Sequence, residues 1–246
     1  MIHTLVRALA MPALLIAAPA LADTVKPTPG APCAAGGGQG TGNPCNGNNG
    51  NPSPEGNAGE KIVRDKKPDP FFIARPGNDR GAFIDQIGQS NRASIAQTTN
   101  TQYARLAQTG DANIAAIRQS GSGAHYAAAR QEGDANNLVV DQGGSAVQVS
   151  LVAQSGYGNA MTVNQSGTGA SSGLAAIQLG DNNRMAMAQD GSNNQAQLTQ
   201  NGSGNAMTAT QNGADNRLIW TQNGNGLSDL AISQSGSQAI QITQSR

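Results

Sequence analysis

The amino-acid sequence predicts an all-β protein, a β-solenoid whose strand–turn–strand rungs form two parallel sheets from half-rungs of about 11 residues. Three observations predict this fold. Gln recurs, mostly at intervals of 11 residues, from Gln86 to Gln244. Gly usually follows this marker Gln by two positions, and Asn often follows it by five. Between the Asn and the next Gln, the side chains alternate in polarity, which is the period of a strand.

The composition points away from an ordinary globular core. Of the 246 residues, 12% are charged and 3% are aromatic, and the formal net charge is zero. A chain with few large apolar residues could be disordered, but disorder usually comes with high net charge. A neutral chain rich in Gln and Asn is instead a candidate for β-assembly. It has no basic patch, so no nucleic-acid partner is expected.

Residues 1–22 are predicted to be a secretory signal peptide. Arg7 provides a positive n-region, residues 8–20 are mainly apolar, and Ala20-Leu21-Ala22 provides small residues for cleavage. The apolar stretch is short and rich in Ala and Pro for a membrane-spanning helix. We therefore expect an exported chain that begins at Asp23 and has no integral membrane segment after signal removal.

Residues 23–79 are predicted to be a flexible tail rich in Gly, Pro and Asn. Cys33 and Cys45 lie in it; in an exported protein such a pair is a possible disulfide, and free thiols are the alternative. No zinc site is expected, because further ligands are absent nearby. The run KIVRDKKPDPFFIARP, residues 61–76, is interpreted as a solvated linker with a sticky spot, although it could be a docking motif.

Residues 80–246 are predicted to be the repeat array. The marker glutamines are Gln86, Gln97, Gln108, Gln119, Gln131, Gln142, Gln154, Gln165, Gln178, Gln189, Gln200, Gln211, Gln222, Gln234 and Gln244. The asparagines in phase with them are Asn91, Asn113, Asn136, Asn159, Asn183, Asn194, Asn205 and Asn216. The turn glycines are Gly88, Gly110, Gly133, Gly156, Gly180, Gly191, Gly202, Gly213 and Gly224, with further ones in less regular units.

Each unit is predicted to be a strand of six or seven residues followed by a turn of about four. In NRLIWTQ, residues 216–222, Asn216, Leu218, Trp220 and Gln222 share one parity. An 11-residue period also suits a right-handed helical coil, but Gly and Asn in every unit weaken a helix. Two units make a rung, so fifteen units make seven and a half rungs, a stack of roughly 35 Å at the usual strand spacing.

The inward Gln and Asn side chains are predicted to form ladders along the stack. A buried amide that lacks partners costs about 1–3 kcal/mol. In an in-register stack, however, each amide can donate to the carbonyl of the same residue type in the next rung. The turn Gly supplies the positive φ that a tight reversal needs.

The end of the array is predicted to be open. The last unit, GSQAIQITQSR, keeps the alternation almost to the final residue, and no cap follows it. Soluble solenoids cap such ends with atypical repeats, because an open edge pairs with other chains. The sequence therefore predicts an amyloid-like fibre of stacked copies.

The motif Gln-x-Gly-x-x-Asn-x-Ala-x-x-x-Gln resembles the repeat of curlins, the subunits of bacterial curli amyloid fibres. QIGQSNRASIAQ, residues 86–97, and QTGDANIAAIRQ, residues 108–119, match it at every fixed position. The ending SQAIQITQSR is similar to that of the minor, nucleating subunit. Units 98–108, 120–131 and 143–154 depart from the motif, and the Cys-containing tail departs from the usual short export segment.

The resemblance implies secretion through outer-membrane curli machinery and assembly with itself and a sister subunit into a cell-surface fimbrium or pilus. Adhesion and biofilm matrix are the implied roles; whether the chain elongates or nucleates stays open. No cofactor is expected, and neither is an enzyme. His125 is interpreted as a surface strand residue rather than as a base. The main alternative is a soluble secreted β-solenoid that acts as an adhesin or binds a ligand such as ice or a surface.

Overall fold

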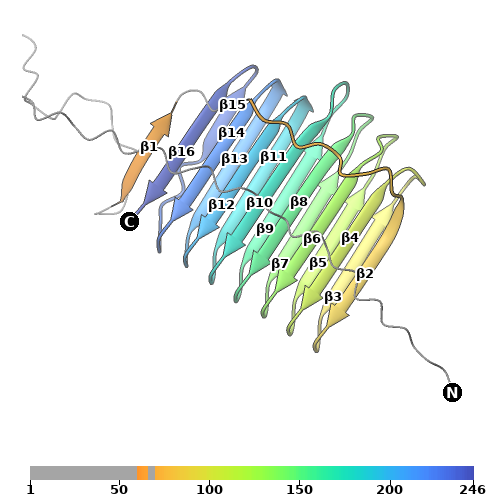
Figure 1. Ribbon diagram of the computed structural model, residues 1–246, viewed down its shortest axis with the longest axis horizontal. Helices are drawn as coiled ribbons and strands as arrows, with labels where there is room; N and C mark the ends of the chain where they lie inside the picture. The colour runs from red at the N-terminus through yellow and green to blue at the C-terminus, as the bar shows by residue number, and fades with distance from the viewer. Residues whose placement is uncertain (1–59, 66–69) are drawn as a thin grey trace, which may run out of the picture. The chain divides into compact units, whose positions relative to one another are not determined.

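The computed structural model describes residues 60–65 and 70–246, and this part of the chain is an all-β solenoid without helices (Figure 1). The predicted signal peptide, Cys33, Cys45 and residues 66–69 lie outside the described residues. Within the described part, no helix is long and apolar enough to cross a membrane.

Sixteen strands are present in the described residues. They are β1 (Lys61–Asp65), β2 (Gly81–Ile87), β3 (Arg92–Gln97), β4 (Tyr103–Thr109), β5 (Ile114–Gln119), β6 (Tyr126–Glu132), β7 (Asn137–Gln142), β8 (Gln148–Ser155), β9 (Ala160–Ser166), β10 (Ser172–Leu179), β11 (Arg184–Ser192), β12 (Gln195–Asn201), β13 (Ala206–Ala214), β14 (Arg217–Asn223), β15 (Ile232–Ser235) and β16 (Ala239–Ser245).

The strands form two sheets, which we call sheet A and sheet B. Sheet A has the order β1-β16-β14-β12-β10-β8-β6-β4-β2, and sheet B has the order β15-β13-β11-β9-β7-β5-β3. The chain therefore alternates between sheets at every turn from β2 to β16. These fifteen strands make seven full rungs and a half, and the predicted β-solenoid is confirmed.

Pairing from β2 to β16 is parallel and sets marker glutamine on marker glutamine. Gln178 pairs with Gln200, and Gln200 with Gln222, in sheet A. Gln189 pairs with Gln211 in sheet B. Even the irregular units form in-register strands, β4, β6 and β8, because the alternation of inward and outward side chains survives in them.

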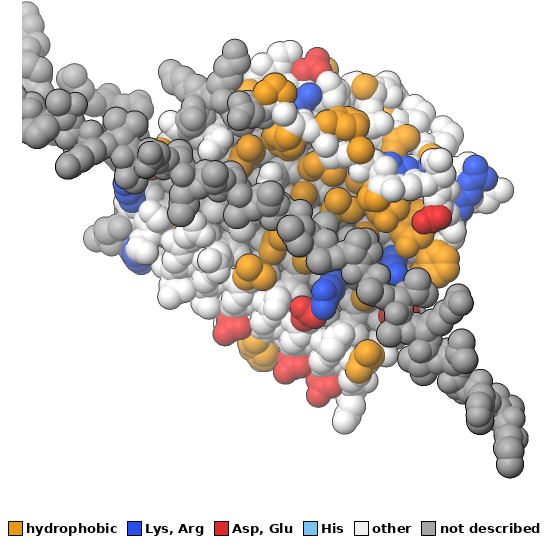
Figure 2. Space-filling model, viewed as in Figure 1, with side chains coloured by type: hydrophobic (Ala, Val, Ile, Leu, Met, Phe, Trp, Pro, Cys, Tyr) orange, Lys and Arg blue, Asp and Glu red, His pale blue; other side chains and the backbone are white. Residues whose placement is uncertain are grey.

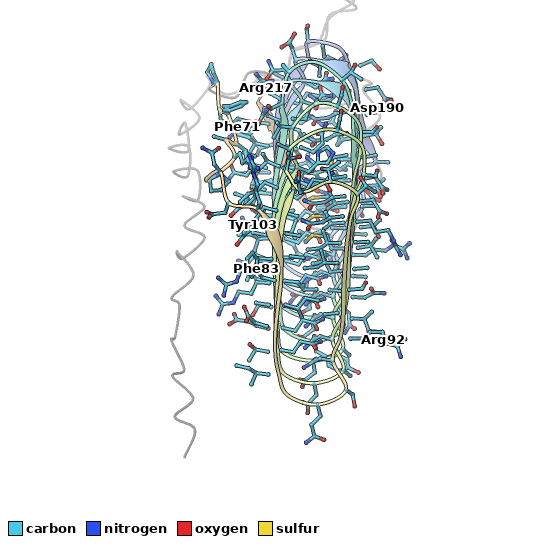
Figure 3. All side chains as sticks on the ribbon, turned by 90° about the vertical axis from the view of Figure 1, so that its right-hand side faces the viewer. Phe71, Phe83, Arg92, Tyr103, Asp190 and Arg217 are labelled. Atoms are coloured by element: carbon cyan, nitrogen blue, oxygen red, sulfur yellow. The ribbon has the colours of Figure 1, made fainter. Side chains whose placement is uncertain are left out.

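The core is a thin apolar layer between the sheets. Along β4, buried residues alternate with partly exposed ones, and Ala104 and Leu106 are fully buried. The same inward columns hold Leu198 in sheet A and Met207 in sheet B. Figure 3 shows the two sheets edge-on, with side chains filling the space between them.

In its described residues, 60–65 and 70–79, the segment before the solenoid differs from the predicted flexible tail and solvated linker. Strand β1 pairs antiparallel with β16 and lies beside it in Figure 1. Residues 70–80 run across sheet A toward β2. The backbone N–H of Ile73 donates to Oε1 of Gln195 at 2.9 Å, and the Arg75 guanidinium donates to the Thr101 carbonyl. Both described parts of the run at 61–76 are therefore bound to the solenoid.

Gly173 explains how residues 70–80 can lie so close to sheet A. A Cβ on Gly173 would lie 2.7 Å from Cβ of Ile73 and 2.6 Å from Oε1 of Gln195. The missing side chain therefore leaves the space that Ile73 occupies. Sequence periodicity could not reveal this contact, because Ile73 and Gln195 are 122 positions apart in the sequence.

Candidate assembly interface

The marker glutamines form two unbroken ladders of hydrogen bonds. Nε2 of each Gln donates to Oε1 of the Gln one rung further along, at distances between 2.6 and 3.0 Å. The sheet A ladder contains Gln86, Gln108, Gln131, Gln154, Gln178, Gln200, Gln222 and Gln244. The sheet B ladder contains Gln97, Gln119, Gln142, Gln165, Gln189, Gln211 and Gln234.

A second bond from the buried marker glutamines between Gln108 and Gln234 joins the two sheets. Nε2 of Gln200 in β12 donates to the carbonyl of Arg184 at the start of β11, at 3.0 Å. Gln189 in β11 makes the same bond to the carbonyl of Gly173 in β10, at 3.2 Å. Both amide hydrogens are thus used, one along the stack and one across it. Glu could not donate these bonds, and Asn is one methylene shorter, so Gln suits the site chemically.

The asparagines of sheet B form a column of a different kind from the expected amide ladder. Oδ1 of Asn91 accepts a bond from the backbone N–H of Asn113 at 2.9 Å. Nδ2 of Asn113 donates to the carbonyl of Gly133 in the next turn, at 2.6 Å. Direct amide-to-amide bonds occur at only two steps of this column, both at 3.1 Å. These Asn side chains therefore hold one turn against the next.

The predicted Asn residues occupy the starts of strands, and their places differ between the sheets. The sheet B column contains Asn91, Asn113, Asn136, Asn159, Asn183 and Asn205, each bonded to the following rung. In sheet A, Asn194 and Asn216 make the same bond.

His125 takes the place of Asn in sheet A, and its assignment to the surface is wrong. Its side chain is 0% exposed. Nδ1 accepts from the backbone N–H of Gln148 at 3.2 Å, and Nε2 lies 2.8 Å from the carbonyl of Ser120, to which it donates. This pattern fits the neutral ring. Burial lowers the pKa of His125 below its usual value, although the bond to Ser120 opposes the shift.

Each regular turn contains two residues in the left-handed region. The predicted glycines all have positive φ, among them Gly110 at 108°. Two positions later the backbone is again left-handed, at Ala112, Asn182 and Asp215, for example. The sequence gives no signal for this second position, because Ser, Ala, Asn, Asp and Gly all occur there. At Gly110, a Cβ would overlap the carbonyl oxygen of Gly133, so stacking also requires the missing side chain.

The ladders give the solenoid a direction and an acceptor end. Gln86 and Gln97 donate into the stack and present Oε1 at the outer side of the first rung, where no described residue donates to them. Strands β2 and β3 each have a neighbour on one side only. Ile84, on the inward parity of β2, is 44% exposed. Among the described residues, the first rung is therefore an uncovered sheet edge.

The other end corrects the prediction that the last unit is uncapped. In sheet A, Nε2 of Gln244 donates to Oε1 of Glu60 at 2.5 Å, and β1 covers β16. In sheet B, Nε2 of Gln234 donates to the carbonyl of Gln238 at 3.1 Å, and the edge strand β15 stays without a cover among the described strands.

The outer faces carry no cluster of metal-ligating side chains within the described residues. On sheet A, Phe83, Tyr103 and Tyr126 lie in a row, with the two Tyr rings stacked at 4.7 Å. Figure 3 places Phe71, Phe83 and Tyr103 on one side of the molecule and Asp190 on the other. Apolar side chains gather on the face that Figure 2 presents. Arg105 and Asp85 form an ion pair at 2.9 Å beside this row.

These features define the class of protein as a parallel, two-sheet β-solenoid with continuous Gln ladders. No model of a known protein family, no curated protein and no solved structure matches the chain.

Proposed function

We propose that this protein is a structural subunit of an extracellular, curli-type amyloid fibre that grows by in-register stacking of rungs. The observation that carries the proposal is the first rung, where two edge strands and two Gln ladders end without a cover from any described residue. Such an edge offers unpaired backbone groups and amide acceptors in the spacing of one more rung. A second copy of the same repeat supplies matching donors.

The resemblance of the repeat to curlins supports assembly outside the cell, on the bacterial surface. The predicted signal peptide supports export, and curlin-like repeats support secretion through outer-membrane curli machinery to a fimbrium on the bacterial surface. By the same resemblance, a sister curlin subunit is a partner. Adhesion and biofilm matrix are the proposed roles of the fibre.

Seeded assembly tests the proposal. Purified residues 23–246, kept monomeric at first, should convert to fibrils that bind thioflavin, with a lag that preformed fragments abolish. Fibre diffraction should show reflections near the usual ~4.7 Å and ~10 Å spacings of cross-β structure. A chain that stays monomeric and β-rich for days at micromolar concentration, with seeds present, would overturn the proposal.

A second candidate is a soluble secreted β-solenoid that acts as an adhesin or binds a ligand or surface. The pairing of β1 with β16 favours it, because soluble solenoids cover their end strands. The row formed by Phe83, Tyr103 and Tyr126 offers such a protein an outer apolar surface. The same seeding experiment separates the two candidates, since the soluble protein neither forms fibrils nor responds to seeds.

A further inference from the structure

Strand β1 ends sheet A instead of continuing it. It runs antiparallel to β16 and pairs Ile62 with Gln244 and Arg64 with Ile242. Glu60, Ile62 and Arg64 thus stand at the parity of the inward column, where the repeat has amides and apolar residues. Charged residues on the inward side of a short strand are a common way to stop further pairing at an edge.

Glu60 takes the ladder position of the missing next Gln. Its carboxylate accepts from Nε2 of Gln244 at 2.5 Å and from the backbone N–H of Ser228 at 3.4 Å. An ionised carboxylate only accepts hydrogen bonds, so it satisfies the last donor and passes no donor onward. The sheet A ladder therefore terminates on Glu60.

Strand β1 buries little apolar surface against the solenoid. Ile62 is its partly buried apolar residue, packed against the core, while Val63 is 49% exposed. A first rung from another copy would bring β2 and β3, with pairing in both sheets and two Gln acceptors. A stacked copy therefore offers more pairing at this end than β1 does.

The number of strands fixes how a second copy fits. From β2 to β16, sheet A has eight strands and sheet B has seven, so β16, the last described strand, lies one half-rung beyond β15. The next half-rung belongs in sheet B, on β15. A copy turned by half a turn about the solenoid axis places its β2 there and its β3 on β16. An unturned copy would place β2 on β16 and leave a gap of one strand in sheet B.

We propose that β15 and β16 form the surface that receives a second copy of this chain, turned by half a turn, and that β1 must leave β16 first. The donors of Gln234 and Gln244 then meet the free acceptors of Gln86 and Gln97. The inference rests on the proposed self-assembly and adds to it the interface, the orientation of the copies and the strand that blocks it.

A reversible lock on β1 tests the blocking role. Val63 and Thr243 are paired on the outward parity of β1 and β16, so V63C/T243C, made with C33S/C45S, can be closed by oxidation. The oxidised chain should lose seeded growth, and a reductant should restore it. Equal growth in both states would overturn the inference. If neither this chain nor the wild type grows in any state, the proposed self-assembly itself fails.

Two variants without a disulfide test the same role of β1, in case the disulfide itself disturbs the solenoid. Ile62→Ser removes the partly buried contact and should raise the rate of unseeded fibre formation roughly fivefold, since more chains are uncapped. Val63→Ser, at the neighbouring outward position, should leave the rate unchanged. Unchanged rates in both variants, with the oxidised lock still growing, would exclude β1 as the block.

Cross-linking of fibrils tests the half-turn. With marker glutamines in register, Ser94 of one copy lies beside Gln241 of the next in the turned stack, whereas Phe83 lies beside Gln241 in the unturned stack. A short bifunctional thiol reagent should therefore give a covalent ladder with S94C/Q241C fibrils and not with F83C/Q241C fibrils, both in the C33S/C45S chain. The reverse result would overturn the turned arrangement, and ladders in neither would overturn this interface.

Discussion

Nε2 of Gln200 donates to Oε1 of Gln222 at 2.9 Å, between strands that are 22 residues apart in sequence. Gln200 also accepts from Gln178 and donates across to the carbonyl of Arg184. Gln200→Ala would leave one amide hydrogen of Gln178 without its acceptor, although the bond of Gln178 to the carbonyl of Ala160 remains, and Oε1 of Gln222 without this donor. We expect a loss of about 1–3 kcal/mol for each unsatisfied group, measured by denaturant unfolding of the freshly purified monomer.

Gln197→Ala is the matched control for that change. Gln197 lies in the same strand, β12, on the outward parity and partly exposed. Its truncation should change the free energy of unfolding by less than about 0.5 kcal/mol. Equal losses for Gln197→Ala and Gln200→Ala would show that the inward ladder adds nothing to stability.

Gly202 tests the stacking of turns. Its φ is +112°, and a Cβ there would overlap the carbonyl oxygen of Gly224 in the next turn. Gly226 also has positive φ, +60°, but a Cβ there meets nothing within 4 Å. We expect Gly202→Ala to reduce the free energy of unfolding by several kcal/mol, and Gly226→Ala by about 1 kcal/mol. Similar losses would mean that backbone conformation alone, and not contact between turns, requires Gly202.

The repeat could be predicted from sequence because every unit obeys the same local rules. The period places Gln200 and its equivalents inward, and two sheets follow once strands alternate with turns. Even β6 and β8, whose units depart from the motif, keep the alternation that decides which side chains face inward. A local pattern repeated fifteen times over-determines the fold.

The parts that sequence reasoning missed depend on contacts between segments far apart in the chain. β1 pairs with β16 across about 180 residues, and its own composition, rich in charge, resembles a linker. His125 is buried and not on the surface as expected, because its position in the inward column decides its burial. The Asn side chains bond mainly to backbone groups, which residue spacing alone does not distinguish from an amide ladder.

Gly173 allows a test of the contact between residues 70–80 and sheet A. Gly173→Ala would place a methyl group against Ile73, so the segment should detach. Chymotrypsin should then cut after Phe72 several-fold faster than in the unchanged protein, since proteolysis follows the population of the open segment. Gly77→Ala changes the same segment without crowding, because the nearest atom lies 3.7 Å away, and should leave the cleavage rate unchanged. Equal cleavage rates in both variants would contradict the contact between Ile73 and Gly173.

His125 should make the solenoid less stable in mild acid. Burial lowers the pKa of the folded-state imidazole below the value of about 6.5 that it has when unfolded. Below pH 6.5 the unfolded chain therefore binds a proton that the folded chain does not, and the free energy of unfolding falls as the pH falls. The slope cannot exceed about 1.4 kcal/mol per pH unit for this one group, and it ends below the folded-state pKa.

The replacement of His125 by Asn separates this effect from other titrations. Asn194 already performs the same task in sheet A, since its Oδ1 accepts from the backbone N–H of Asn216 at 3.2 Å, as Nδ1 of His125 does from Gln148. We expect His125→Asn to fold and to lose most of the change in unfolding free energy between pH 7.5 and 5.5. Comparison of denaturant unfolding curves at the two pH values measures this. A variant whose stability falls as steeply as that of the wild type would show that another group causes the pH dependence.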